Sequence, residues 1–566
     1  MRITTVASIS GILLLAAPPG WAQQADTAAS APSRLAPQSL LGAGAGGYGA
    51  APLFSAFPTA GALLPPSFQV PDLKPQAEAP RPLAITASAA AREKFSTNVY
   101  RTAGSTKSDF ITTANGNLGV DVDSRLLKGG VKYGLGYDKY ATHTELDGFR
   151  HNGIGLFDAE LIDQRLFVAA RASVSEQSVS QREHTGQTGP NSSAGNTSAG
   201  NMVRVYTTSI APRFQHRFGD IALGQISYHH DETWYEDVSK AQSSSTSATS
   251  SIKAADLEKS VTDGGRLELR SGDSFSRLIW DYTGDVDHEE TKGRTYDQVS
   301  NTVGAAYRLT GEFALLAAAG NDYIHSNSVD LDKYGGVFYT GGLHWTPSPK
   351  TDLRVGLGHR YDRPHWIVLG AHWLGPRTVM RVSSDAGITT DALSFEKSLN
   401  AVRRDETGNF VNPFSGFDAD PAASPFTRSN AIYWQRNTDF VLRHDEVRDS
   451  FALSVRLAEQ RILGGYTGTN TTSPASGSAT SRGASLSWRH HLTPNLSGMA
   501  TISQYDTVVS DTTPGRTTQR KGSLELSYTM NPTLLGSAGY SAATTSPTPT
   551  GSIREDVIAI GIKKTF

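Results

Sequence analysis

The stretch IREDVIAIGIKKTF (553–566) alternates apolar and polar residues with a period of two. Ile558, Ile560, Ile562 and Phe566 fall on one face, which only Lys564 interrupts near its end. The opposite face carries Glu555, Val557, Ala559, Gly561 and Lys563. A helical period of 3.6 residues does not fit this order, so the stretch predicts a β-strand whose two faces meet different surroundings.

Segments from about Leu83 onward repeat this alternation. Clear examples are TDLRVGLGHRY (351–361), SFALSVRLAE (450–459) and KGSLELSYTM (521–530). A soluble sandwich could show the same period, but its strands usually run five or six residues, whereas a tilted membrane-spanning strand needs about nine to eleven. The segments here run about 10 to 15 residues, which favours strands that cross a membrane.

The connections between these segments alternate in length. Counted back from Phe566, the short ones are 530–532, 492–495, 444–446, 374–377, 346–350, 309–312, 271–273, 218–220 and 162–164. The longer, polar ones between them include 181–202, 239–256, 391–430 and 458–480, and 391–430 could hide or replace strands. Transmembrane barrels have short periplasmic turns on one rim and longer loops on the other. We therefore predict an all-β, antiparallel transmembrane barrel over 83–566 with about 22 strands (range 18–24), both ends lying in the periplasm.

The first 82 residues differ from the rest. Arg2, the apolar run 8–17 and the small residues Gly20 and Ala22 predict a secretory signal peptide over 1–22; the alternative is the start of a buried helix. Residues 23–82 are rich in Ala, Pro and Gly and predict a disordered periplasmic tail, which could also dock a partner. Together with the barrel, the export signal places the chain in the bacterial outer membrane.

Composition excludes several classes of protein. The chain has no cysteine, so it forms no disulfide and no thiolate metal site. Its net charge of −2 lacks the basic bias of a nucleic-acid binder. The apolar run 8–17 is too short for a membrane-spanning helix.

Four blocks resemble one known family. They are KSDFITTANGNLGVDVDS (107–124), HNGIGLFDAELIDQRLFVAARASVSEQ (151–177), IAPRFQHRFGDIALGQISYHHDET (210–233) and 342–390, which begins GLHWTPSPKTDLRVGLGHRYD. In the order of the blocks and in their residue pattern, they are similar to the outer-membrane barrels associated with PEP-CTERM/exosortase and exopolysaccharide systems. The resemblance implies an outer-membrane location and a link to exopolysaccharide production or export, and it supplies no catalytic residues.

No enzymatic motif is present: the chain has no phosphate-binding loop, nucleophile elbow or metalloprotease signature. We therefore predict no enzyme and no cofactor, although a triad built from separated positions stays open as an alternative. The clusters 229–232 (HHDE) and 285–290 (DVDHEE) could hold a metal, but a solvated rim explains them more simply, so no metal site is predicted.

Charged residues at alternate strand positions predict a polar lumen. The lumen-facing candidates are Arg171, Arg266, Glu268, Arg270, Arg354, Arg360, Arg381, Arg456, Glu525 and Lys563. They could form cross-strand ion pairs that stiffen the wall, or they could attract anionic or hydroxyl-rich solutes. Tryptophans near predicted strand ends indicate an interface girdle.

These features lead to a functional hypothesis. The chain takes part in exopolysaccharide export, as a passive channel or as a component of the export assembly. Two alternatives are a structural or docking barrel without conductance and an outer-membrane hydrolase. A plugged receptor of similar strand number is disfavoured, because 23–82 are too few and too low in complexity for a folded plug. The expected partners are outer-membrane lipid, the barrel-assembly machinery that reads Ile558, Ile560, Ile562 and Phe566, and, for export, polysaccharide and periplasmic export proteins.

Overall fold

In the computed structural model, the described residues are 83–178, 202–238, 257–405, 409–412, 429–464, 477–510, 515–548 and 551–566, with 414, 419, 421 and 426 between them. The predicted signal peptide and tail lie outside these residues. So do most of the predicted loops 181–202, 239–256 and 458–480.

Twenty-two strands form one antiparallel sheet. The first fifteen are β1 (Leu83–Ser96), β2 (Asp109–Asp123), β3 (Leu127–Tyr140), β4 (Gly148–Ile162), β5 (Leu166–Ser178), β6 (Met202–Phe218), β7 (Ala222–Asp237), β8 (Ser260–Ser271), β9 (Leu278–Thr291), β10 (Arg294–Arg308), β11 (Phe313–Ser326), β12 (Gly336–Ser348), β13 (Thr351–Arg360), β14 (Arg363–Gly375) and β15 (Thr378–Thr389). The others are β18 (Ile432–Asp445), β19 (Asp449–Gly464), β20 (Gly477–Thr493), β21 (Leu496–Ser510), β22 (Gly515–Asn531), β23 (Leu534–Thr548) and β24 (Gly551–Thr565).

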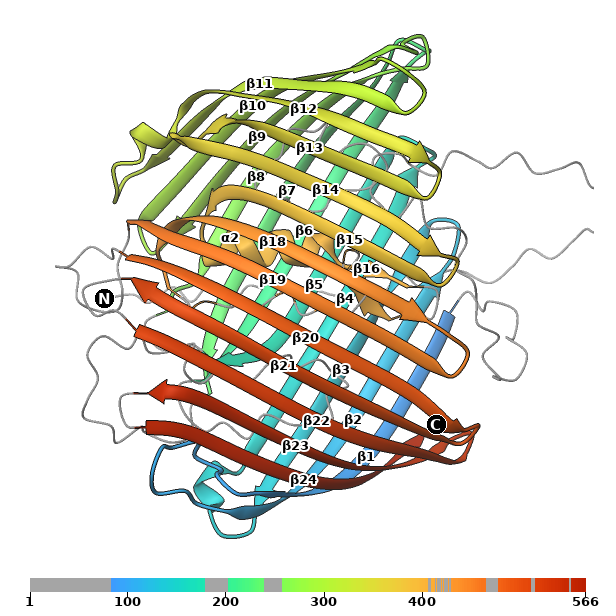
Figure 1. Ribbon diagram of the computed structural model, residues 1–566, viewed down its shortest axis with the longest axis vertical. Coiled ribbons are helices and arrows are strands. Elements are labelled where there is room, and N and C mark those ends of the chain that lie inside the picture. The colour runs from blue at the N-terminus through green and yellow to red at the C-terminus, as the bar shows by residue number, and fades with distance from the viewer. Residues whose placement is uncertain are drawn as a thin grey trace, which may run out of the picture. The chain divides into compact units, whose positions relative to one another are not determined.

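Each strand pairs with its neighbour in the chain, and β24 pairs with β1 to close the sheet into a barrel (Figure 1). The closing register runs from Ser88 opposite Thr565 to Ser96 opposite Val557. Full closure leaves no strand edge unpaired, which is the condition for a sheet to lie in lipid. The predicted fold class and strand number are confirmed.

The remaining elements are short. They are η1 (Thr144–Leu146), η4 (Asp332–Tyr334), α2 (Asp391–Ala401), β16 (Arg403–Arg404) and β17 (Phe410–Val411). Among the described residues, no helix has both the length and the apolar character needed to cross a membrane.

The two rims differ as the connection lengths predicted. The short turns 163–165, 219–221, 309–312, 376–377, 446–448, 494–495 and 532–533 all lie on the rim where β24 ends. One further turn on this rim, 124–126, was missing from the prediction. Three connections on the opposite rim, 292–293, 361–362 and 549–550, are also only two residues long, so loop length alone does not distinguish the rims everywhere.

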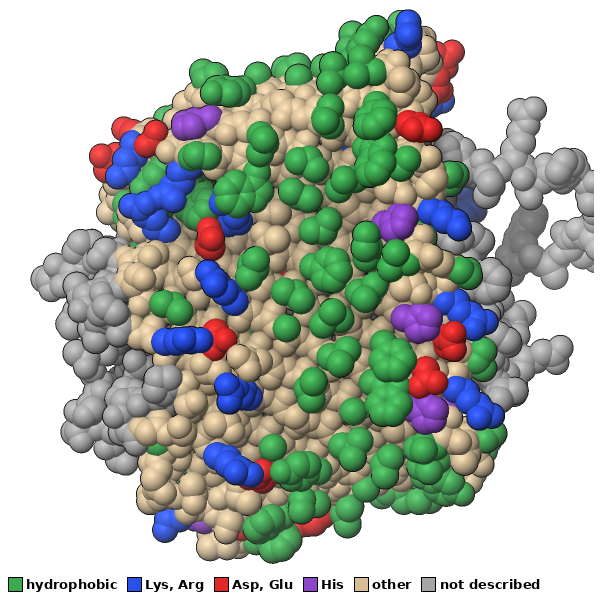
Figure 2. Space-filling model, viewed as in Figure 1, with side chains coloured by type: hydrophobic (Ala, Val, Ile, Leu, Met, Phe, Trp, Pro, Cys, Tyr) green, Lys and Arg blue, Asp and Glu red, His purple; other side chains and the backbone are tan. Residues whose placement is uncertain are grey.

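The outer surface carries the apolar face of the strands. Ile558, Ile560 and Ile562 are 56%, 61% and 46% exposed, while Glu555 and Val557, which precede them on the opposite face, are 6% exposed. Hydrophobic side chains spread over the outer face of β11–β15 and β18–β24 (Figure 2). Aromatic pairs mark the band near the short turns: Phe313 stacks with Trp345 at 6.1 Å, and Phe451 with Trp488 at 6.0 Å.

Candidate functional site

The inner face of the barrel carries the predicted lumen residues. Register and burial place them on the side of the sheet opposite the exposed apolar band: Arg171, Arg266, Glu268, Arg270, Arg354, Arg360, Arg381, Arg456, Glu525 and Lys563. They are spread around the wall and do not gather at one point.

Many of them form ion pairs with carboxylates of the same wall. Arg360 and Asp322 are 2.7 Å apart and almost fully buried, and Arg360 also donates to Ser300 at 3.0 Å. The other pairs are Arg354 with Asp352 (3.0 Å), Arg456 with Asp439 (2.6 Å), Arg171 with Asp158 (3.7 Å), and Arg266 with Asp285 and Glu268. Such pairs favour wall stiffening as the main role of these residues. Glu525 and Lys563 make no hydrogen bond or ion pair with another described residue.

The lumen also holds a segment that the sequence pattern assigned to a polar loop. The described residues within 390–431 form no barrel strand; they include α2, β16 and β17, and α2 lies inside the barrel (Figure 1). Thr390 caps α2 by accepting from the backbone N–H of Leu393 at 3.2 Å, and its hydroxyl donates to Glu289 at 2.6 Å. Asp391 accepts from the backbone N–H of Ser429 at 2.7 Å and from the hydroxyl of Tyr433 at 2.8 Å. The two ends of the segment are therefore tied together beside the wall.

Apolar side chains dock α2 on the inner wall. Phe395 packs with Val203 and Val205 of β6. Leu399, which is 0% exposed, packs in a cluster with Ile154 and Leu156 of β4. Full burial of a Leu or Phe side chain stabilises by about 1.5–3 kcal/mol, so these contacts are the main source of the docking energy.

Polar contacts extend the docking surface beyond the helix. Asn400 lies 3.3 Å from the hydroxyl of Ser209 on β6. Arg404 pairs with Asp121 of β2 at 2.6 Å. The ammonium of Lys132 on β3 donates to Asn409 at 2.7 Å. Arg381 of β15 donates to the carbonyl of Phe414 at 2.9 Å, so the segment reaches from β15 to the wall around β2.

An acidic group is buried where α2 meets the wall. Glu396 is 2% exposed, accepts from Thr262 at 3.3 Å, and leaves its second oxygen, Oε2, without a hydrogen-bond partner among the described residues. Burial, followed by the nearby charges of Asp231 and Glu289, raises the pKa of Glu396 well above 4.5. Lys397 of α2 supplies a positive charge that acts on Glu289. This contact is therefore sensitive to protonation.

The two predicted polar clusters split across the sheet. His229 and Asp231 face the lumen, where His229 lies 3.3 Å from Asp287, whereas His230 faces outward and pairs with Asp263 at 2.8 Å. Alternate residues of a strand point to opposite faces, so adjacent residues do not converge. In the described part of the chain, no group of three His, Asp or Glu side chains is arranged to hold a metal ion.

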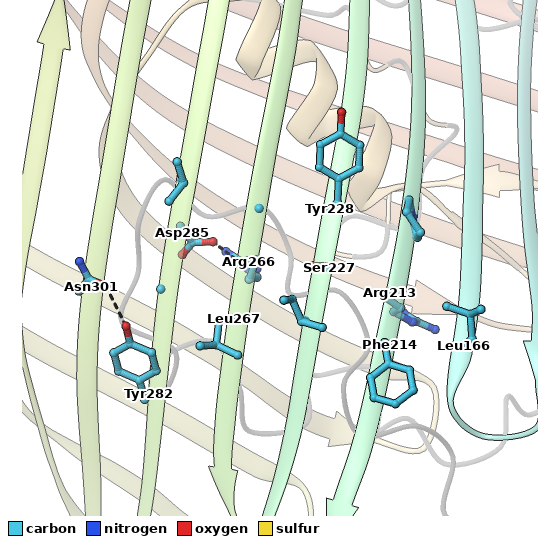
Figure 3. Close-up of a pocket in the computed structure, with 15 residues that line it drawn as sticks. Leu166, Arg213, Phe214, Ser227, Tyr228, Arg266, Leu267, Tyr282, Asp285 and Asn301 are labelled. Atoms are coloured by element: carbon cyan, nitrogen blue, oxygen red, sulfur yellow. Dashed lines mark hydrogen bonds and ion pairs between the residues drawn. The ribbon is translucent and has the colours of Figure 1, made fainter.

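A depression of about 590 Å³ lies on the outer wall and not in the lumen. Its rim includes Phe214, Leu267 and Tyr282, and Tyr282 donates to Asn301 at 2.8 Å. Figure 3 shows α2 on the far side of the strands from this depression. Two of its lining positions, Gly265 and Gly284, have no side chain to fill it. It is a hollow in the apolar surface, of the kind that lipid chains cover.

Sequence reasoning missed α2 and its docking residues. The signal was present: Thr390 and Asp391 are typical of a helix start, and Ala392, Phe395 and Leu399 follow at helical spacing. The length of the connection suggested an outer loop and masked this short helical period.

Among known proteins, this chain has matches in solved structures but none in family models or curated sequences. Among solved structures, it is similar to the FrpB iron transporter from Neisseria meningitidis (F3-3 variant), with a TM-score of 0.47 and 10% identity over 92% of this chain and 86% of that chain. It is also similar to the siderophore receptor PirA from Pseudomonas aeruginosa (TM-score 0.36, 10% identity, 86% and 81% covered) and to the outer membrane protein OpdK from the same organism (0.32, 8%, 85% and 99%).

Proposed function

We propose that this chain is an outer-membrane passage whose lumen is constricted by the segment 390–431, and that it takes part in exopolysaccharide export. The observation that carries the proposal is α2, a helix held inside a wide polar barrel by contacts that can be broken without opening the wall. A barrel of 22 strands encloses a lumen unless something fills it.

The outer face supports a placement of the barrel across a membrane. On β22 the outward positions from Arg520 to Met530 cover roughly 23 Å of depth, at ~3.3 Å per residue and ~45° tilt. An apolar band of about 25 Å is typical of transmembrane barrels. The rim with short turns is then periplasmic, and periplasmic export proteins are the partners proposed to meet the barrel there.

The choice of cargo rests on the resemblance of four sequence blocks to exopolysaccharide-associated barrels. The inner wall suits such a cargo, because its hydroxyl-bearing residues can donate hydrogen bonds to a hydroxyl-rich chain. Passage would be passive, with no covalent step.

Planar-bilayer conductance tests the proposal. The protein is compared with a variant in which 391–430 is replaced by a short Gly–Ser linker. We expect a small or intermittent current for the full chain and a several-fold larger, steady current for the variant, which purified polymer fragments should block. No current from either protein would favour the structural barrel, and shortening of the fragments on incubation would favour the hydrolase.

A further inference from the structure

The outer surface of β18–β24 carries a row of arginines at the loop-side edge of its apolar band. We name as the arginine row Arg436 on β18, Arg461 on β19, Arg482 on β20, Arg516 and Arg520 on β22, and Arg554 on β24. Figure 2 shows Lys and Arg side chains along this side of the face, with hydrophobic side chains beyond them.

Register establishes that these side chains point outward. Arg482 lies opposite Leu457, which is 44% exposed, and is followed on its own face by Leu486 and Trp488. Arg520 shares its face with Leu524 and Leu526, and Arg554 shares its face with Ile558. Each arginine therefore lies where the apolar band gives way to headgroups, and none lies at mid-height.

Carboxylates neutralise only part of the row. Arg554 pairs with Asp556 at 2.9 Å, Arg516 lies 3.6 Å from Asp506, and Arg436 lies 3.9 Å from Glu459. Arg520 donates to the neutral Gln504 at 3.1 Å. Within the described residues, Arg461 and Arg482 make no ion pair or hydrogen bond, and both side chains are exposed to the surroundings of the barrel. Among the described residues, three guanidinium groups thus have no carboxylate within 4.0 Å, although Asp506 lies opposite Arg482 in the register.

One end of the row is held rigidly. The guanidinium of Arg436 lies 3.4 Å from the ring centroid of Trp366 and 5.0 Å from that of Trp434. Since Arg436 is only 6% exposed, this stacking packs it into the wall as the fixed end of the row, and its guanidinium is not itself open to a ligand.

The opposite side of the barrel has the reverse charge at the same end of the strands. The outward carboxylates there are Glu176 on β5, Glu232 and Glu236 on β7, Asp263 on β8, Glu290 on β9 and Asp297 on β10. Basic side chains lie beside these carboxylates: Arg204 pairs with Glu176 and Glu236, and Lys259 pairs with Glu232. The bases named in this sector are therefore each paired with a carboxylate, unlike Arg461 and Arg482 of the arginine row.

We propose that the arginine row binds a glycolipid of the outer leaflet whose sugar headgroup carries phosphates. An arginine guanidinium can donate two parallel hydrogen bonds to the oxygens of one phosphate, and the adjoining apolar band accommodates acyl chains. Thr480, which lies among the arginines, offers a hydrogen bond to a sugar hydroxyl, whereas Gln504 and Thr518 already donate to Asp506. A free phosphate would use only the cations, so the apolar band beside them favours the lipid.

Native mass spectrometry of the full chain in neutral detergent tests this site. The probe is bis-phosphorylated lipid A, compared with the same lipid after removal of its phosphates. The test variant is Arg461→Gln/Arg482→Gln/Arg520→Gln. The control is Lys139→Gln/Lys259→Gln, which removes outward charges from the other sector, where the two side chains are 56% and 53% exposed. Each basic residue near a charged membrane surface contributes several-fold in affinity, so we expect roughly hundredfold weaker binding for the triple variant and no change for the control.

Three results would overturn the proposal. They are equal binding by the triple variant, equal binding of the lipid without phosphates, and lipid-independent pairing of two copies that the triple variant abolishes. The last would assign the row to the acidic sector of a second copy. Both variants must show the heat-dependent gel migration of a folded barrel; if the triple variant does not, Arg482→Gln alone replaces it, with about fivefold weaker binding expected from the loss of one basic residue.

Discussion

The docking of α2 can be tested at one buried side chain. Leu399 is 0% exposed and packs against Ile154 and Leu156 of the barrel wall. Replacing a buried Leu by Ala costs about 3–5 kcal/mol when a cavity remains, and somewhat less when the site can collapse or fill with water. The lumen side of α2 can relax in both ways, so we expect Leu399→Ala to weaken docking by about 3 kcal/mol. Since about 1.4 kcal/mol corresponds to a tenfold change, the docked population falls by roughly a hundredfold relative to the undocked one.

The absence of cysteine from the sequence makes the measurement direct. Ser398 is exposed on α2, so Ser398→Cys accepts a spin label without disturbing the packed face. In nanodiscs, the label should be immobilised in the parent protein and become mobile once Leu399→Ala is added. Conductance should rise in the same variant.

Leu457→Ala is the matched control, because Leu457 is 44% exposed on the outer face and does not contact α2. It should leave the label immobilised. A label that stays equally immobile in Leu399→Ala, with the barrel folded, would refute a contribution of this size from the Leu399 contacts. A label already mobile in the parent protein would refute docking itself.

Three further perturbations have defined outcomes. Burial raises the pKa of Glu396 well above 4.5, so the docked helix retains a proton that the undocked helix releases. Its contribution to docking is therefore fully present below pH 4.5 and is lost as pH rises through the docked pKa. Conductance should increase over that window, and Glu396→Gln should remove the increase; an unchanged pH profile would contradict it. Ile502 is 60% exposed in the apolar band, so Ile502→Arg should lower the free energy of unfolding by about 2–4 kcal/mol, measured by urea titration in liposomes, while Thr501→Arg on the lumen face should change it little. Asp322→Asn leaves the buried Arg360 without its charged partner and should cost about 3–5 kcal/mol in the same assay; a loss below about 1 kcal/mol would show that water reaches the pair.

The barrel was predictable because its physical constraint is repeated in every strand. Lipid on one side and polar side chains on the other impose a period of two, as in Ile558, Ile560 and Ile562. The turn lengths then identify the rims, since the short turns need only about two or three residues to join antiparallel neighbours. Even the missed turn at 124–126 follows this rule.

The lumen was less predictable, because alternation assigns a face but not a partner. It assigns Arg360 of β13 to the lumen face, yet the contact with Asp322 of β11 depends on how both strands line up against β12 between them. The helix α2 posed a different problem. Its apolar residues Phe395 and Leu399 are too few to stand out in a long polar connection, and their partners Val203 and Ile154 lie far away in sequence.

The positions of charge on the two faces give the barrel an asymmetric design. Inside, most arginines are satisfied by carboxylates of the same wall, as Arg456 is by Asp439 at 2.6 Å, so they rigidify the wall and leave little free positive charge for a solute. Outside, Arg461 and Arg482 have no such partner among the described residues and lie at the level of headgroups. Unlike the wall, the segment that contains α2 can leave the lumen. Its docking depends on apolar contacts and on one protonatable group, Glu396. Any change in what the barrel lets through is therefore expected to come from this segment while the wall stays fixed, and the Ser398→Cys label and the conductance assay should report the change together.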